Sequence, residues 1–266
     1  MSISGFFKSY WQRAVRASLK ARLARQPPQL TLERSTWPQS LLAPTTFYLD
    51  CVRFFNRKLP AQFQAHRAYF QNGRGFGENA FHAMWFLLLE EFKPANFLEI
   101  GVFRGQVISL VSLWAKLRGV TCEVCGISPF SGAGDSSSTY RRDLDYYQDT
   151  LQNFDHFALP HPNLLRASSL APEATRFIGS RPWAMIYIDG NHDYEVARQD
   201  WEVCSQNVKA SGIIVLDDAG LTTSFSPPAI ATAGIAGPSQ LAREIDRSRF
   251  SELLQVGHNR VFQKLS

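Results

Sequence analysis

Residues 97–110 read FLEIGVFRGQVISL, and this stretch decides the fold. Four of its first six residues are apolar, glycines stand at positions 101 and 105, and a second apolar run follows. The pattern predicts a buried strand that turns through Gly101 and Gly105 into a helix. Glycines at such a turn let the backbone pass close to a ligand, and the helix start offers unpaired N–H groups. The stretch alone does not distinguish a cofactor site from a structural corner.

Apolar strands and helices alternate along the chain from residue 96. We expect strands at 96–101, 121–127, 163–168, 183–189 and 213–218, and helices at 105–118, 138–154, 171–179 and 194–210. Continuous apolar strands separated by helices indicate a parallel sheet with both faces covered. Two last strands, 250–256 and 260–265, flank a GHN turn and are expected to pair antiparallel. The predicted fold is α/β, with a doubly wound, mostly parallel, seven-stranded Rossmann-like sheet and an antiparallel terminal strand.

Three segments are expected along the chain: a basic amphipathic helix or arm at 1–28, a helical cap at 29–75 and the Rossmann-like domain at 76–266. In the arm, apolar residues recur at helical spacing until Pro27 and Pro28, and cations gather on the opposite side. Such a helix suits peripheral contact of residues 1–26 with an anionic membrane surface. A segment packed on the body and an organellar transit segment fit the same pattern.

Charge and cysteine content narrow the class of protein. The formal net charge is +5, but six of the 28 basic residues precede the first acid, Glu33, which leaves 22 basic and 23 acidic residues in the rest. A nearly neutral body argues against a nucleic-acid partner. The four cysteines are too few and too scattered for a disulfide framework, and no apolar run is long enough to span a membrane. We therefore expect a protein of the reducing cytoplasm, with the arm as its only membrane contact.

Acids follow two of the expected strands. The fourth strand ends in YIDGNHDY and the fifth in VLDDAG, so Asp189, His192, Asp217 and Asp218 should gather at the same edge as the glycine turn. Carboxylates crowded in this way resist ionisation unless a cation lies among them, and oxygen ligands suit Mg²⁺. His192 can serve as a base because imidazole titrates near neutral pH. The alternative is that some acids cap the next helix, as Asp193 could.

The spacing of the two glycines argues against a dinucleotide. Position 103 is Phe, and no third glycine completes a G-x-G-x-x-G pattern. A nicotinamide dehydrogenase is therefore disfavoured. A cofactor without a pyrophosphate tolerates Arg104 in the turn.

Three parts of the sequence carry a resemblance to a known family. FLEIGVFRGQ at 97–106, YIDGNHDYEVARQDWEVCSQNVKASGIIVLDD at 187–218 and the closing strand pair resemble class I S-adenosylmethionine-dependent methyltransferases. The similarity is greatest to their metal-dependent O-methyltransferase branch, which includes the macrocin-type sugar O-methyltransferases, and it covers about residues 75–265.

The resemblance implies a set of site residues. Cofactor contacts are carried over to Glu99, Gly101, Val102, Phe103, Gly105, Ser128, Phe130, Ser168 and Asp189. The implied ligands of a divalent metal, expected to be Mg²⁺, are Asp189, Asp217 and Asp218, and the implied catalytic base is His192. Ser128 departs from the family pattern, in which an acid at the end of the second strand often binds the ribose hydroxyls.

The activity that the resemblance implies is methyl transfer from S-adenosylmethionine to a hydroxyl of a sugar, glycan or secondary metabolite. A metal would bind two neighbouring hydroxyls and His192 would take one proton. The N-terminal cap and the loop at 221–239 would select the acceptor. Two other functions use the same fold: a cephalosporin-hydroxylase-like metal enzyme, and a non-catalytic module that binds a membrane surface or a partner.

Overall fold

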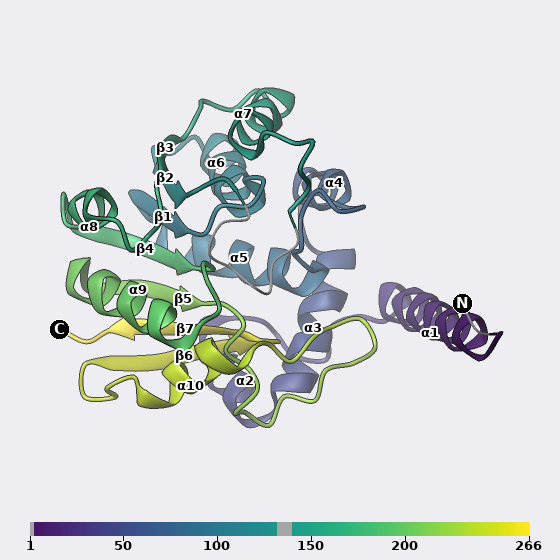
Figure 1. Cartoon of the computed structure of the whole chain (residues 1–266). Helices are drawn as coiled ribbons and strands as arrows, with labels where there is room; N and C mark the ends of the chain where they lie inside the picture. The colour runs from purple at the N-terminus through teal and green to yellow at the C-terminus, as the bar shows by residue number, and fades with distance from the viewer. Residues whose placement is uncertain (1–2, 132–139) are drawn as a thin grey trace.

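A single seven-stranded sheet organises the chain (Figure 1). The computed structural model describes residues 3–131 and 140–266, with side chains from residue 11. The strand order is β3-β2-β1-β4-β5-β7-β6, and only β7 runs antiparallel to its neighbours. The strands are β1 (Asn96–Ile100), β2 (Glu123–Ser128), β3 (Asn163–Arg166), β4 (Trp183–Ile188), β5 (Val208–Leu216), β6 (Phe250–Val256) and β7 (Asn259–Lys264). The predicted doubly wound sheet is confirmed.

Helices cover both faces of the sheet and create two hydrophobic cores. One core lies under α3 (Pro44–Arg57), α5 (Asn79–Phe92), α6 (Gln106–Arg118) and α7 (Tyr146–His156), and the other under α8 (Pro172–Ile178), α9 (Tyr194–Asn207) and α10 (Ala236–Glu244). Along β4, Met185 and Tyr187 face the first core while Ile186 and Ile188 face the second. Successive side chains of a strand point to opposite faces, so β4, which is buried on both faces, contributes alternately to the two cores.

Two of the expected helices differ from the observed ones by more than two residues at one end, and most other bounds differ by one or two residues. The helix expected at 194–210 ends at Asn207, and β5 begins at Val208, which pairs with Trp183. Lys264 Nζ donates to the carbonyls of Ser205 and Val208, so a residue from the chain's far end closes this helix. The helix expected at 138–154 begins at Tyr146, where the Asp145 side chain caps its first N–H groups; positions 138 and 139 lie outside the described residues.

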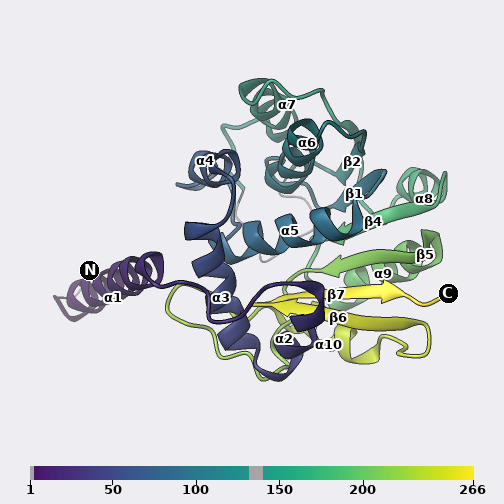
Figure 2. The ribbon, with the colours of Figure 1, turned by 180° about the vertical axis from the view of Figure 1, so that it is seen from behind.

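The N-terminal elements after α1 pack on α5, α6 and β6. The N-terminal elements are α1 (Ile3–Arg25), a 3₁₀ turn (Arg34–Thr36), α2 (Pro38–Leu42), α3 and α4 (Ala61–Tyr69). The connector after α1 is held by Asp50, whose carboxylate accepts the N–H groups of Gln29 (2.9 Å) and Leu30 (3.1 Å) and pairs with Arg53 (2.7 Å). The α1 helix itself projects away from the body in both views (Figures 1 and 2). In the described parts of the chain, no helix is both long and apolar enough to cross a membrane.

Both glycines of the opening stretch are required by the backbone. Gly101 has φ +99°, and a Cβ there would lie 1.9 Å from the carbonyl oxygen of Asp189. Gly105 has φ +75° at the N-cap of α6, and its Cβ would lie 2.7 Å from the Thr150 side chain. Gly101 therefore serves a close approach between the turn after β1 and the loop after β4, and Gly105 turns the chain into the helix.

We expect Gly101→Ala to lower the free energy of unfolding by roughly 2 kcal/mol or more beyond the effect of Gly119→Ala. Gly119 has φ +64°, but a Cβ at that position would meet no atom within 4 Å, so it controls for backbone strain without a clash. Urea unfolding followed by circular dichroism measures both variants. Equal losses would show that the close approach to Asp189 can relax.

Candidate active site

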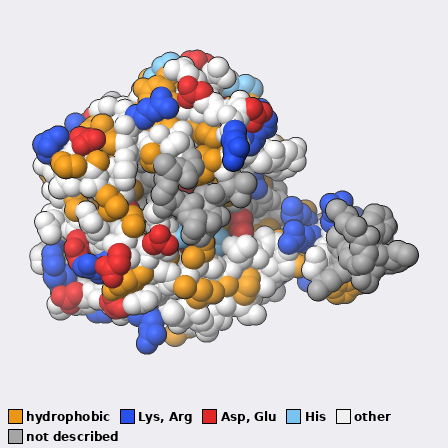
Figure 3. Space-filling model, in the orientation of Figure 1, with side chains coloured by type: hydrophobic (Ala, Val, Ile, Leu, Met, Phe, Trp, Pro, Cys, Tyr) orange, Lys and Arg blue, Asp and Glu red, His pale blue; other side chains and the backbone are white. Residues whose placement is uncertain are grey.

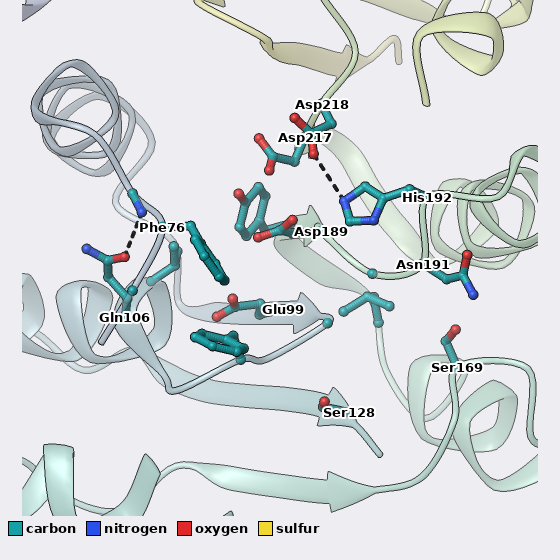
Figure 4. Close-up of a pocket in the computed structure, with 18 of the residues that line it drawn as sticks. Phe76, Glu99, Gln106, Ser128, Ser169, Asp189, Asn191, His192, Asp217 and Asp218 are labelled. Carbon is teal, nitrogen blue, oxygen red and sulfur yellow. Dashed lines mark hydrogen bonds and ion pairs between the residues drawn. The ribbon is translucent and has the colours of Figure 1, made fainter. Parts of the chain in front are cut away.

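A cavity of about 800 Å³ opens at the carboxyl ends of β1, β2, β4 and β5 (Figure 4). Its walls come from the residues that follow these strands, from the loop before α5, from the start of α5 and from the turn between β6 and β7. This is the edge at which open parallel sheets bind their ligands, and the volume suits a cofactor-sized molecule. The cavity has two chemically different ends.

The first end is the glycine turn. The carboxylate of Glu99 lies almost fully buried at the cavity wall, where it accepts the N–H of Ile108 in the first turn of α6 (3.2 Å). Burial raises the pKa of Glu99 to about 8, although the Ile108 hydrogen bond works against that shift. Arg104 in the turn forms a two-point ion pair with Asp149 at 2.6 Å, which neutralises the one cation of this segment. A buried acid that faces a cavity can bind a cationic or hydrogen-bond-donating group.

The predicted cofactor residues fall into two groups. Those that line the cavity are Glu99, Gly101, Phe103, Ser128, Ser168 and Asp189. The others do not line it: Val102 packs toward Gly126 of β2, Gly105 faces Thr150, and the buried Phe130 ring packs on Tyr147 at 5.3 Å. Ser128 uses its hydroxyl to accept the N–H of Phe130 (3.1 Å). The turn after β2 thus directs the Phe130 ring onto Tyr147, outside the cavity lining.

The second end of the cavity is acidic. The carboxyl of Asp189 shares a hydrogen bond with that of Asp217 and a second one with the hydroxyl of Tyr187. Burial raises the pKa of Asp189 well above its usual range, and the charges of Asp217 and Asp218 add to the rise. Burial likewise raises the pKa of Asp217. The structure therefore brings together the three predicted metal ligands, in an arrangement that favours a proton or a cation among them.

His192 lies beside these acids, with its Nε2 3.0 Å from Asp218 Oδ2 (Figure 4). The same loop carries Asp193 at the N-cap of α9, but the Asp193 side chain makes no capping hydrogen bond. Its backbone N–H donates instead to the Asn191 side chain (2.8 Å). The loop thus turns His192 toward the acidic end of the cavity.

His258 completes this end of the cavity and was not predicted. Its Nε2 lies 3.4 Å from Asp217 and 3.7 Å from Asp218. Among the described residues, these three side chains are the one group of three or more His, Cys, Asp or Glu whose possible metal-binding atoms all lie within 4.8 Å of one another. Burial lowers the pKa of His258, but the charges of Asp217, Asp218 and Glu78 outweigh it, so the pKa is raised overall. Asp217 Oδ1 is buried and accepts no hydrogen bond. Two carboxylates, one imidazole and an unsatisfied buried oxygen fit a divalent cation.

Other polar residues at the cavity or directly behind its wall were also missed. Glu78 accepts the hydroxyl of Tyr48 (2.6 Å), and burial raises the pKa of Glu78 to about 7. Asp200 lies buried on α9 and hydrogen-bonds Ser169 at the wall. Asp200 was detectable in the sequence, because it occupies an apolar helix face with Ala197 and Trp201. Glu78 was not, since only folding brings α3 and the start of α5 together.

Comparison with known proteins agrees with this geometry. Residues 98–219 match the family model described as a methyltransferase domain. Comparison with curated protein sequences gave no match. The chain therefore contains a methyltransferase domain, and the resemblance to class I S-adenosylmethionine-dependent methyltransferases is confirmed for fold and domain.

Solved structures with this fold include an O-methyltransferase from Bacillus cereus in complex with SAH. It is 13% identical, covers 88% of this chain and 100% of its own, and has a TM-score of 0.51. The O-methyltransferase TomG from Streptomyces achromogenes, in complex with SAM, is 11% identical over 89% of this chain and 100% of its own (TM-score 0.51). SAH-bound PaMTH1 from Podospora anserina is 13% identical, and the match covers 78% of this chain and 89% of PaMTH1 (TM-score 0.53). At these identities the likeness shows the fold alone.

The raised pKa of Glu99 predicts how stability varies with pH. Because the folded-state pKa of about 8 exceeds the ordinary value of 4.5, the contribution of Glu99 is fully present below about pH 4.5 and is lost as pH rises through 8. Each pKa unit corresponds to about 1.4 kcal/mol, so the loss amounts to a few kcal/mol. In ligand-free protein, Glu99→Gln should weaken the fall in unfolding free energy between pH 5 and 8.5. Glu173→Gln, on the exposed face of α8, is the control; an unchanged slope in Glu99→Gln would contradict the assignment.

Proposed function

We propose that the protein is an S-adenosylmethionine-dependent O-methyltransferase that acts, with a divalent cation, on a hydroxyl of a sugar, glycan or secondary metabolite. One observation carries the proposal: a single cavity has the glycine turn and Glu99 at one end and the group of Asp217, Asp218 and His258 at the other. A methyltransferase needs such a pair of neighbouring sites, because the methyl donor and the acceptor oxygen must meet in line.

The glycine-turn end suits the methyl donor. S-adenosylmethionine, when bound, supplies an electrophilic methyl group on a sulfonium. Glu99 is placed to accept hydrogen bonds from its amino group, and Gly101 leaves the wall without a side chain at that point. Gln106 adds a buried Nε2 with no hydrogen-bond partner at the cavity wall, while its Oε1 accepts the N–H of Gly77 (2.9 Å). A free amide donor there can satisfy a carboxylate of the ligand.

The acidic end suits the acceptor. Asp217 and Asp218 would hold the cation together with a neighbouring donor, and a bound cation would lower the pKa of an acceptor hydroxyl. His192 lies 3.0 Å from Asp218 and is placed to take the proton from that hydroxyl, while Asp218 orients its ring. Asp189 contacts both Tyr187 and Asp217, so it fixes the direction of the Asp217 carboxylate.

The charge of the cavity wall favours a neutral acceptor. Among the described residues that line it, the only Lys or Arg is Arg104, which is already paired with Asp149. The acids of the wall are more numerous: Glu78, Glu99, Asp189, Asp193, Asp217 and Asp218. A phosphate or carboxylate on the acceptor would find no unpaired Lys or Arg among the described wall residues to neutralise its charge. A polyol or another uncharged molecule with neighbouring hydroxyls avoids that cost.

The α1 helix supports a second, separate role, peripheral contact with an anionic membrane. Its packed end is fixed by Leu23, which is buried, while Trp11 near the other end is 67% exposed. The described part of the helix has no acid and five exposed cations, Arg13, Arg16, Lys20, Arg22 and Arg25. Figure 3 shows basic side chains on the part of the helix next to the body. The helix projects from the body, so a membrane could reach it. Its positive charge is complementary to anionic lipids, and an exposed Trp can insert at the membrane interface.

Binding of the methyl donor's product tests the first proposal. S-adenosylhomocysteine at about 100 times its dissociation constant should raise the unfolding free energy by about 2.7 kcal/mol, and NAD should not. Labelled S-adenosylmethionine should then transfer its methyl group to neutral vicinal diols more readily than to carboxylated or phosphorylated analogues. No stabilisation by S-adenosylhomocysteine would refute the methyltransferase and leave the hydroxylase-like or non-catalytic alternatives.

Vesicle flotation tests the arm. The full chain should float with vesicles of phosphatidylcholine and phosphatidylserine, remain unbound with phosphatidylcholine alone, and dissociate as salt is raised. Replacing Arg13, Arg16 and Lys20 by Gln should abolish flotation. The same change at three exposed cations of the body, Lys209, Arg243 and Arg249, is the matched control. Binding that survives deletion of residues 1–26 would assign the contact elsewhere.

A further inference from the structure

We propose that His258 is a direct ligand of the cation, and that the site therefore prefers a first-row transition ion such as Mn²⁺, Fe²⁺ or Zn²⁺ to Mg²⁺. The inference deepens the proposed function, on which its role in catalysis rests. The sequence pattern and the resemblance placed only carboxylates at this site, and nothing in either pointed to the turn between β6 and β7.

The distances suit a shared ion better than a direct ion pair. Ligand atoms held about 2.1 Å from one ion lie roughly 3 to 4 Å apart. His258 Nε2 lies 3.4 Å from Asp217 Oδ1 and 3.7 Å from Asp218 Oδ1, both beyond the usual length of about 2.8 Å for a charge-assisted hydrogen bond. A small contraction of the three side chains would bring all three donors onto one ion.

The other ring nitrogen of His258 supports the same role. Nδ1 lies 3.2 Å from the backbone carbonyl oxygen of Thr232 and 3.0 Å from its hydroxyl. A carbonyl only accepts, so the Nδ1–H donates to it. In the neutral ring, the form that binds a metal, the lone pair is then on Nε2, which faces the two carboxylates. Metal-binding histidines are typically oriented by this kind of hydrogen bond from the ring nitrogen that does not bind the metal.

The backbone holds His258 in place beside the acids. Its carbonyl accepts the N–H of Ala219, the residue directly after Asp218, at 2.8 Å. Its ring packs on Phe81 of α5 with centroids 4.7 Å apart, and only 7% of the residue is exposed. The neighbouring Gly257 has φ +61°, and a Cβ there would lie 3.0 Å from the same Phe81 ring. These contacts hold the His258 backbone and ring next to the acids without help from an ion.

A nitrogen ligand changes which ion the site prefers. Mg²⁺ is bound almost entirely by oxygen, whereas imidazole suits Mn²⁺, Fe²⁺, Co²⁺ and Zn²⁺ better. His192 is not in this group of three: its Nε2 lies 3.0 Å from Asp218 Oδ2, and its proposed role is to take the acceptor's proton. Asp189 does not join the group of three; it contacts Asp217 and Tyr187 and so positions one ligand.

The proposal is tested by titrating the purified full chain with Mn²⁺. Binding is measured as the loss of the electron paramagnetic resonance signal of the free ion. Wild type should bind one Mn²⁺ that a tenfold excess of Mg²⁺ fails to displace. His258→Ala should weaken binding by roughly tenfold or more, since even residues that only orient a metal ligand have effects of that size. The control is His161→Ala, because His161 is exposed and pairs with Asp155 (2.8 Å) away from the cavity. An affinity in His258→Ala within twofold of wild type would overturn the proposal.

A spectroscopic measurement avoids dependence on a variant that fails to fold. Pulsed resonance on bound Mn²⁺ should detect nitrogen coupling in wild type and in His192→Ala, and His258→Gln should lose it. Absence of nitrogen coupling in His192→Ala would exclude His258 as a ligand.

Stabilisation by S-adenosylhomocysteine, measured on the same samples, reports separately on the methyltransferase proposal. If wild type shows no such stabilisation while the nitrogen coupling is present, the proposed activity fails and the metal ligand stands. If stabilisation is present and coupling is absent, His258 fails as a ligand and the activity stands.

Discussion

Three backbone hydrogen bonds at the ends of adjacent strands hold the site together. The N–H of Gly101 donates to Ile127 (2.8 Å), that of Asp189 to Ile100 (2.9 Å), and that of Asp217 to Ile188 (3.0 Å). Each extends the parallel ladder by one residue beyond its strand, so residues far apart in sequence leave the sheet side by side. The missing Cβ of Gly101 then lets the loop after β4 close onto the turn after β1. The two ends of the cavity adjoin for this reason.

The same ladder concentrates negative charge where water is scarce. Burial raises the pKa values of Glu99, Asp189 and Asp217, which means that the ligand-free site is electrostatically unfavourable. The fold tolerates these unfavourable groups because the buried strands β4 and β5 hold Asp189 and Asp217 in place. Binding of cations, whether a metal ion or a sulfonium, relieves this cost. The unfavourable charge and the proposed chemistry thus have one physical origin.

Helix α5 forms part of the cavity wall, and the N-terminal helices α3 and α4 pack on α5. Tyr48 of α3 donates to Glu78, and Phe81 of α5 packs on His258. At the wall, His82 contacts His66 of α4, which lies behind it (3.1 Å between ring nitrogens), and burial lowers the pKa of His66 to about 3. These buried, neutral polar contacts tie α3, α4 and α5 to the methyltransferase fold. In the proposed reaction, these helices would therefore both select the acceptor and support His258 of the proposed metal site.

The sequence by itself determined the fold class, the glycine turn and the gathering of Asp189, Asp217 and Asp218, because strand periodicity is local and parallel strands end at one edge. Tertiary structure alone decided the rest. Helix α9 ends at Asn207 because Lys264, distant in sequence, binds its last carbonyls. His258 joins the acids because the antiparallel pairing of β7 with β5 brings its turn to their side, and a long-range pairing of this kind leaves no local pattern in the sequence.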